Sequence, residues 1–228
     1  MDSQYPYLLK YVIKDELLQQ LVSVNRGTSW SMIDYELLPK ASFYYARKFF
    51  HPILLSIDHE PGEPLKLWVV NDTLDSYQGK VIIQVITFDG TEVYRRDWVA
   101  EVTSNQAVFL GQAEEGEIIN GNLPEQVIVK VSAEGSAAPD NYYYLRDPKD
   151  LLLQNSQLEV VADEELQTVT IKAGSILARM VKIDLPQGRI RLSDNYFDLL
   201  PKEERTIKVS HRDGTHVFFA ELSVSTFN

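Results

Sequence analysis

From residue 53 onward, short runs of β-branched and aromatic residues recur at even intervals and are separated by turn residues. Such runs are typical of strands, and no helical pattern separates them. Successive strands without helices between them favour antiparallel sandwiches over βαβ units. We therefore predict a mainly β chain with two consecutive β-sandwiches. The expected strands are 53–57, 65–70, 80–88, 92–99, 106–110, 126–131 and 142–145, then 158–161, 168–172, 177–183, 189–192, 205–209 and 217–224.

Turn residues mark where these strands reverse. Asp89-Gly90 stands between two runs and predicts a tight hairpin, because Asp-Gly suits the left-handed backbone of a two-residue turn. Pro61-Gly62 and Asn71-Asp72 mark two other reversals, and residues 116–124 form a longer connection. The loop Arg212-Asp213-Gly214 predicts a final hairpin.

Length and composition allow two folded domains. The 228 residues can bury one large core or two small ones, and 44% hydrophobic with 24% charged residues is ordinary for a globular chain. Residues 142–145 complete the first group of strands, and Asp147-Pro148-Lys149-Asp150 follows as a turn-forming boundary. We therefore place the two sandwiches at 53–147 and 148–228, after a short α-helical segment within 1–52.

Helical spacing precedes the strands. Residues 5–24 carry apolar side chains at three- and four-residue steps, the pattern of an amphipathic helix. Farther on, Phe43, Tyr44 and Phe50 form a second apolar face, and Pro52 ends the pattern. This face needs a partner, and three are open: the first sandwich, the helix at 5–24, or a second copy of the chain in a homodimer.

Two stretches carry a family resemblance. Ser29 to Pro52 (SWSMIDYELLPKASFYYARKFFHP) is similar to the run that closes the catalytic (β/α)8 barrel of β-mannosidases of glycoside hydrolase family 2. Leu192 to Pro201 (LSDNYFDLLP) resembles a Ser-Asp-Asn-Tyr-Phe-Asp-Leu-x-Pro run of the domain that ends those enzymes. The resemblance implies that residues 1–52 are a helical remnant of the barrel and that both sandwiches are immunoglobulin-like. We expect structural roles for Asp34, Lys40 and Arg47, whose charges would hold the helix to the barrel or to the first sandwich.

The resemblance implies a function for the parent enzyme rather than for this chain. Family members hydrolyse terminal β-D-mannose by a retaining mechanism with two glutamates, both on earlier barrel strands. Here Glu16 falls on the N-terminal helix, Glu36 follows a turn, and Glu114-Glu115 reads as a solvated acidic loop. We expect an accessory part that is inactive alone and has the catalytic barrel as its partner. The alternative is a stand-alone carbohydrate-binding or interaction module.

Aromatic side chains are the candidates for sugar contact, because rings stack on pyranose faces. The core is the competing location: we favour it for Trp68, leave it open for Trp98, and expect Tyr143 to alternate inward. Trp30 is expected to pack locally, although the matching residue of the family lies beside the active-site mouth. The remaining candidates for contact with β-mannosides or manno-oligosaccharides are Tyr77, Tyr94, Tyr142 and Tyr144.

Metal and cofactor sites have little support. His51 and His59 flank a strand, while His211 and His216 flank the loop that holds Asp213, so a hairpin with surface histidines is favoured over a metal site. The sequence has no Gly-rich phosphate loop and no Gly-x-Ser-x-Gly motif. We expect no cofactor and no metal.

Charge and cysteine content narrow the partners further. A net charge of −11 and a pI near 4.8 disfavour nucleic acid, which needs clustered lysine and arginine. Residues 1–20 carry charges within their apolar run, so we expect neither a signal peptide nor a membrane span there. The absence of cysteine fits a reducing compartment, and a cytoplasmic location is expected.

Overall fold

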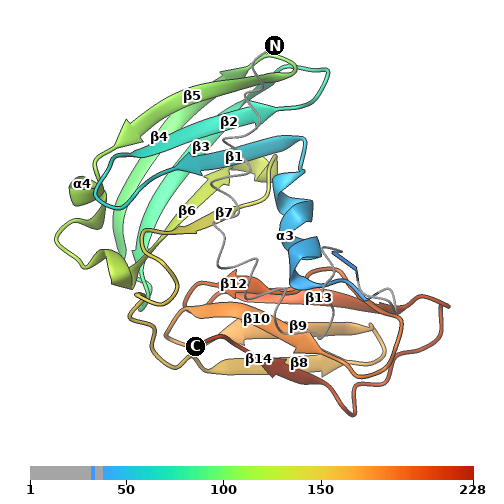
Figure 1. The fold of residues 1–228 in the computed structure, drawn as a ribbon. Helices are drawn as coiled ribbons and strands as arrows, with labels where there is room; N and C mark the ends of the chain where they lie inside the picture. The colour runs from blue at the N-terminus through green and yellow to red at the C-terminus, as the bar shows by residue number, and fades with distance from the viewer. Residues whose placement is uncertain (1–31, 34–37) are drawn as a thin grey trace. The chain divides into compact units, whose positions relative to one another are not determined.

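The structure is a computed structural model that describes residues 32–33 and 38–228. The chain forms two compact units, each containing one β-sandwich (Figure 1). The predicted helix at 5–24 and the residues Trp30 and Asp34 lie outside the described residues. Within the described part, no helix is long and apolar enough to cross a membrane.

The predicted short helix is present as α3, Ala41–Phe49, directly before the first strand. Just before α3, Ile33 and Pro39 form an isolated bridge, and the Lys40 N–H donates to the Met32 carbonyl (3.0 Å). Up to Ala46, α3 belongs to the second unit. There the ring of Tyr44 is buried and lies 6.1 Å from the ring of Tyr196.

The first unit holds a seven-stranded sandwich. Three strands form one sheet in the order β1-β2-β5, and four form the other in the order β4-β3-β6-β7, all antiparallel. Side chains that alternate inward from both sheets make one apolar core, for example Leu55, Leu67, Val81, Ile83 and Val129. Its strands are β1 (Ile53–Asp58), β2 (Leu65–Asn71), β3 (Tyr77–Thr87), β4 (Glu92–Val102), β5 (Gln106–Ala113), β6 (Val127–Ala133) and β7 (Asn141–Tyr144).

Short helices interrupt the connections of this sandwich, which the alternating pattern did not predict. The long connection contains α4, Glu115–Ile119, and a 3₁₀ turn, Pro124–Gln126. A second 3₁₀ turn, Glu134–Ser136, leads from β6 toward β7. One turn of α4 suffices to insert Ile118 fully into the core.

The second unit also holds seven strands in two antiparallel sheets, ordered β11-β13-β9-β8 and β12-β10-β14. Its core is equally apolar and is centred on Val169, Ile171, Val181, Phe197 and Ile207. The strands are β8 (Leu158–Asp163), β9 (Thr168–Ala173), β10 (Ala178–Asp184), β11 (Ile190–Leu192), β12 (Phe197–Leu199), β13 (Glu204–His211) and β14 (Ser223–Ser225). The predicted fold class, two immunoglobulin-like sandwiches after a short helix, is confirmed.

The C-terminal strand differs from the prediction. The turn predicted at 212–214 forms, with the Gly214 N–H donating to the His211 carbonyl (3.0 Å), but no strand follows it to make a hairpin. Of the strand predicted over 217–224, only the end forms, within β14, and β14 pairs with β10. The physical reason is a side chain that takes the place of a neighbouring strand: Gln167 accepts the Val217 N–H (2.8 Å) and donates to the Val217 carbonyl (2.9 Å). These bonds satisfy backbone groups that a ladder would otherwise pair.

Candidate functional site

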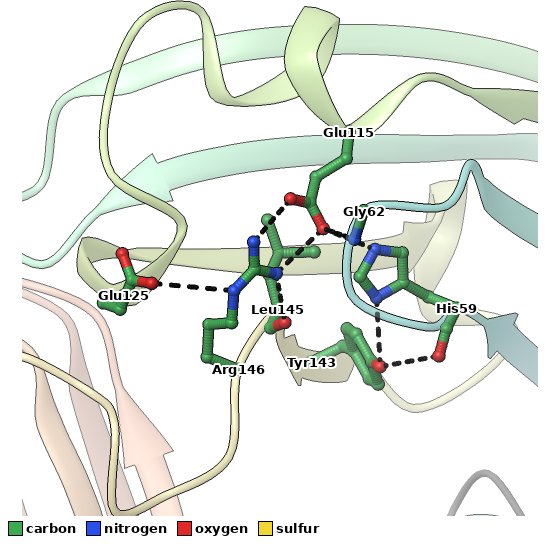
Figure 2. A network of polar contacts seen from close by, with 7 residues as sticks. All are labelled: His59, Gly62, Glu115, Glu125, Tyr143, Leu145 and Arg146. Carbon is green, nitrogen blue, oxygen red and sulfur yellow. Dashed lines mark hydrogen bonds and ion pairs between the residues drawn. The ribbon is translucent and has the colours of Figure 1, made fainter.

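A buried polar cluster lies at one end of the first sandwich (Figure 2). It consists of His59, which directly follows β1, Glu115 at the start of α4, Tyr143 on β7, and Arg146 just after β7. We call these four residues the ion cluster. His59 is 1% exposed and Glu115 is 8% exposed, so their polar atoms depend on protein partners.

Glu115 is the acceptor at the centre of the ion cluster. Arg146 donates to it through two nitrogens, Nη2 to Oε1 at 2.7 Å and Nη1 to Oε2 at 2.9 Å, the forked geometry that suits a guanidinium and a carboxylate. Oε2 also lies 2.9 Å from Nε2 of His59 and accepts the Gly62 N–H at 3.0 Å. The other side of Arg146 faces Glu125, with Nε 3.6 Å from its Oε1.

These contacts fix the charge on Glu115. The hydrogen bond from Arg146 lowers the pKa of this carboxyl from 4.5 to about 2, against the opposing effect of burial, and the Gly62 N–H adds to the lowering. The same bond raises the pKa of Arg146. Glu115 is therefore an anion throughout the neutral range.

Tyr143 completes the ion cluster on the other side of His59. Its hydroxyl donates to the His59 carbonyl at 3.2 Å and lies 3.3 Å from Nδ1 of the same residue. Burial raises the pKa of Tyr143, so its hydroxyl stays protonated at neutral pH. The inward direction predicted for Tyr143 is confirmed by its packing against the core.

This arrangement suits a structural role, holding segments of the chain together, rather than acid–base catalysis. A general acid of a glycosidase needs a raised pKa, and a nucleophile needs an oxygen that faces the sugar. Glu115 has a lowered pKa, and both of its oxygens accept bonds from the protein. The ion cluster instead joins the β1–β2 turn, α4 and the end of β7, which are distant in sequence.

One sequence interpretation fails at the ion cluster. Glu115 does not lie in a solvated loop, because α4 turns its side chain inward while Glu114 stays exposed. His59 follows a strand as expected, and it is buried. Arg146 carries no sequence signal beyond being a lone arginine after an aromatic strand, so its partners emerge only from the fold.

The aromatic candidates separate into inward and outward groups. Tyr77 is buried in the core, and Trp98 packs partly against it, with the guanidinium of Arg96 4.8 Å from its ring centre. A Cβ on Gly111 would lie 2.8 Å from Nε1 of Trp98, so the indole packs where only glycine leaves room. Trp68 lies outside the core cluster, contrary to the favoured interpretation, and its ring centre is 5.3 Å from that of Phe109.

The tyrosines of β7 also point alternately to opposite faces of their sheet. Tyr142 pairs with Lys130 in the ladder, and the Lys130 ammonium lies 5.6 Å from the Tyr142 ring centre. Tyr144 pairs with Ile128 on the same face, opposite to that of Tyr143. Tyr94 packs partly buried against the core.

The four histidines have separate partners and form no common site. His211 Nδ1 lies 3.9 Å from Asp213, whereas His216 faces Glu164 at 4.0 Å. His51 Nδ1 bonds the backbone of Ile53 beside it. Among residues 32–33 and 38–228, no group of three metal-ligating side chains of histidine, aspartate or glutamate is present.

The motif at 192–201 has a structural explanation in the second sandwich. Asn195 accepts the Ile183 N–H (2.8 Å) and donates to the Ile183 carbonyl (3.0 Å), while Asp198 accepts the Met180 N–H (2.7 Å). Met180 has φ +49° within the irregular part of β10, so Asp198 stabilises a bulge there. Asp194 bonds Arg205 at 3.0 Å.

Known proteins match both units. Residues 63–150 match the family model described as a mannosidase Ig/CBM-like domain, and residues 153–227 match a model described as an Ig-fold domain, named for mannosidases. Beta-mannosidase A of Aspergillus terreus is 24% identical over 84% of this chain and 22% of its own length. Beta-mannosidase B of Aspergillus clavatus is 23% identical over 85% of this chain and 25% of its own length.

Solved structures show the same fold. The beta-D-mannosidase of Dictyoglomus thermophilum superimposes with a TM-score of 0.69 at 23% identity, over 88% of this chain and 24% of that one. The exo-chitosanase of Amycolatopsis orientalis gives 0.55 at 15% identity, over 86% of this chain and 29% of that one. The chain thus spans about a quarter of the length of these relatives. Its two units match the mannosidase Ig/CBM-like and Ig-fold domain models, and the chain is similar to the C-terminal immunoglobulin-like domains of β-mannosidases of glycoside hydrolase family 2.

Proposed function

We propose that this chain serves as the accessory C-terminal part of a glycosidase that hydrolyses terminal β-D-mannose, with the two sandwiches bracing its catalytic barrel. The observation that carries the proposal is the pair of consecutive matches over 63–150 and 153–227. Both belong to the mannosidase domains of much longer relatives. We divide the chain at 52 and 147 into a barrel remnant and the two sandwiches.

The state of Glu115 supports an accessory role. A retaining glycosidase requires two carboxyl groups that face the substrate, one of them protonated before the reaction. The carboxyl of Glu115 is buried, ionised and fully bonded within the sandwich. We therefore infer that catalysis by the parent enzyme depends on the barrel.

A domain-replacement experiment tests this role. The last two domains of a relative, such as the Dictyoglomus thermophilum enzyme, are replaced by residues 53–228 and compared with the same enzyme truncated after its barrel. We expect the chimera to release aglycone from an aryl β-mannoside and to keep this activity on heating better than the truncated form. Release by this chain alone above a blank would contradict the accessory role, as would a chimera no better than the truncated enzyme.

A homodimer through the helical segment and a cytoplasmic location remain predictions. Tyr44 is covered within the chain, whereas Phe50 is 72% exposed and is left as the apolar residue for a second copy. Light scattering of the purified chain checks the dimer, with a monomer mass as the contradicting result.

A carbohydrate-binding module is the second candidate function. The specific observation in its favour is the outward position of Trp68 beside Phe109 on the first sandwich.

A further inference from the structure

The outer face of the three-stranded sheet in the first sandwich presents an aromatic pair. On β2, Leu65, Leu67 and Val69 point into the core, so Lys66, Trp68 and Val70 share the opposite face. The ladders place Ser56 of β1 and Phe109 of β5 on either side of Trp68. We call this surface the outer face; its members are Leu54, Ser56, Asp58, Lys66, Trp68, Val70, Ala107 and Phe109.

The exposed apolar surface of the outer face is concentrated at Phe109, which is 45% exposed, and Trp68 is partly exposed beside it. The rings of Trp68 and Phe109 are inclined at 53° with centres 5.3 Å apart. The neighbouring Ser56 and Val70 are buried, at 6% and 7% exposed. Leaving a large ring in water forgoes the free energy that burial would give, so a partner that covers the pair would be bound favourably.

The aromatic pair offers a small apolar area. The exposed part of Phe109 is about 90 Å², if the whole side chain can bury roughly 200 Å², and the buried neighbours Ser56 and Val70 add almost nothing to it. A standard protein interface buries about 800 Å² on each side and would have to extend well beyond the pair. One or two sugar rings match the dimensions of the pair itself.

Polar groups at the border of the pair suit the hydroxyls of a sugar. Lys66 and Asp58 occupy paired positions, with Nζ 3.7 Å from Oδ2, and both remain partly exposed. Gln112, opposite Lys66 on β5, is also exposed. A pyranose combines an apolar C–H face with hydroxyls that donate and accept, so rings next to an ammonium, a carboxylate and an amide offer complementary chemistry.

We propose that the outer face binds the pyranose rings of β-linked manno-oligosaccharides, with Trp68 and Phe109 as the stacking pair and Lys66, Asp58 and Gln112 as hydroxyl partners. The choice of mannose rests on the proposed function. Such a site would hold the polymer near its enzyme without taking part in bond cleavage.

Calorimetric titration of the full chain with β-1,4-mannohexaose tests the proposal, with Phe109→Ala as the main variant. The Phe109 ring is largely exposed, so its loss should leave the fold intact while weakening binding about tenfold. Phe218→Ala is the matched control, because Phe218 is an exposed ring of the second sandwich, and its affinity should be unchanged. No saturable binding by the unaltered chain would overturn the proposal, as would equal affinities for the unaltered chain and both variants.

Tryptophan fluorescence locates the ligand. Mannohexaose should shift the emission of the unaltered chain, and Trp68→Phe should abolish most of that shift while the other two tryptophans remain. If the shift survives in Trp68→Phe, the site lies elsewhere and the proposal fails. If the emission of Trp68 responds to an added β-mannosidase barrel but not to the sugar, the outer face is a protein contact. Either failure leaves the accessory role intact, because the chimera tests that role independently.

Discussion

Two buried polar sites, one in each sandwich, are stabilised in different ways. In the first sandwich, the carboxylate of Glu115 is held by Arg146 and contacts His59. In the second, which also buries the charged residues Arg179 and Asp198, the uncharged side chain of Asn195 bonds both backbone groups of Ile183. The contacts of the ion cluster span 31 to 84 residues, whereas Asn195 reaches Ile183 over 12.

The difference predicts unequal tolerance to substitution and pH. A buried charge that loses its partner is far more costly than a buried amide that loses one, because an ion is harder to remove from water. Stability should therefore depend more steeply on the carboxylate of Glu115 than on the neutral amide of Asn195. Five experiments test this comparison.

Replacing Glu115 with glutamine should have the largest effect. The substitution keeps the shape of the side chain but leaves Arg146 and His59 without their anion, and Glu125 compensates for only part of that loss at 3.6 Å. We expect the free energy of unfolding of the first sandwich to fall by about 3 kcal/mol. Urea unfolding followed by tryptophan fluorescence measures the fall, since Trp68 and Trp98 both lie in this sandwich.

Glu114→Gln is the control for this change. Glu114 is exposed and makes no side-chain bond to the start of α4, so its replacement should alter stability by less than about 0.5 kcal/mol. Equal effects of the two substitutions would show that burial of the carboxylate is unimportant.

Acid should weaken the first sandwich through the same group. The pKa of Glu115 falls from 4.5 to about 2 on folding, so its contribution is complete above pH 4.5 and is lost as the pH falls toward 2. The loss amounts to at most about 3 kcal/mol. Urea midpoints between pH 7 and pH 2 measure it. The difference between the unaltered chain and Glu115→Gln should shrink over that interval; a constant difference would contradict the assigned ionisation.

Asn195→Ala should destabilise the second sandwich to a smaller extent. The change leaves the N–H and carbonyl of the buried Ile183 without their partner, at a cost of about 2 kcal/mol. Amide exchange in a peptide spanning β10 should accelerate, whereas peptides of β2 and β3 should keep their rates. Asn155→Ala, at an exposed position before β8, serves as the control. Equal acceleration in both sandwiches would show that they do not unfold independently.

The sequence predicted features whose causes are local and missed those assembled across the chain. Alternation located most strands, and residues 192–201 were recognised by their resemblance to a family run. In the structure, Asp194, Asn195 and Asp198 of this run bond residues at most 18 positions away. The ion cluster unites His59, Glu115 and Arg146, and no spacing connects them before the sheets pair.

The errors share that cause. Glu115 looks identical to Glu114 in the sequence, and only the turn of α4 separates a buried anion from a solvated one. Trp68 lies in the apolar run of β2, yet strand alternation and the bulge opposite it place its ring beside Phe109. The strand predicted from Val217 does not form there, because the side chain of Gln167, 50 residues earlier, hydrogen-bonds the backbone N–H and carbonyl of Val217.

Tyr143→Phe should have the smallest effect on stability, about 1 kcal/mol, because the hydroxyl bonds are long at 3.2 and 3.3 Å. Urea unfolding measures this change, with Tyr94→Phe as the control because Tyr94 is only partly buried. A loss as large as that of Glu115→Gln would contradict the ranking.

The same hydroxyl reports the charge on His59. If its proton points to the His59 carbonyl, Nδ1–H donates to the oxygen while Nε2–H donates to Glu115, so both ring nitrogens carry protons. We expect ¹⁵N spectra at pH 7 to show an imidazolium at His59, with the exposed His216 as the internal reference. An unprotonated Nδ1 would mean that the hydroxyl donates to the ring instead. The ion cluster would then carry one positive charge fewer, and the contrast with the neutral bonds of Asn195 would rest on the Arg146–Glu115 pair alone.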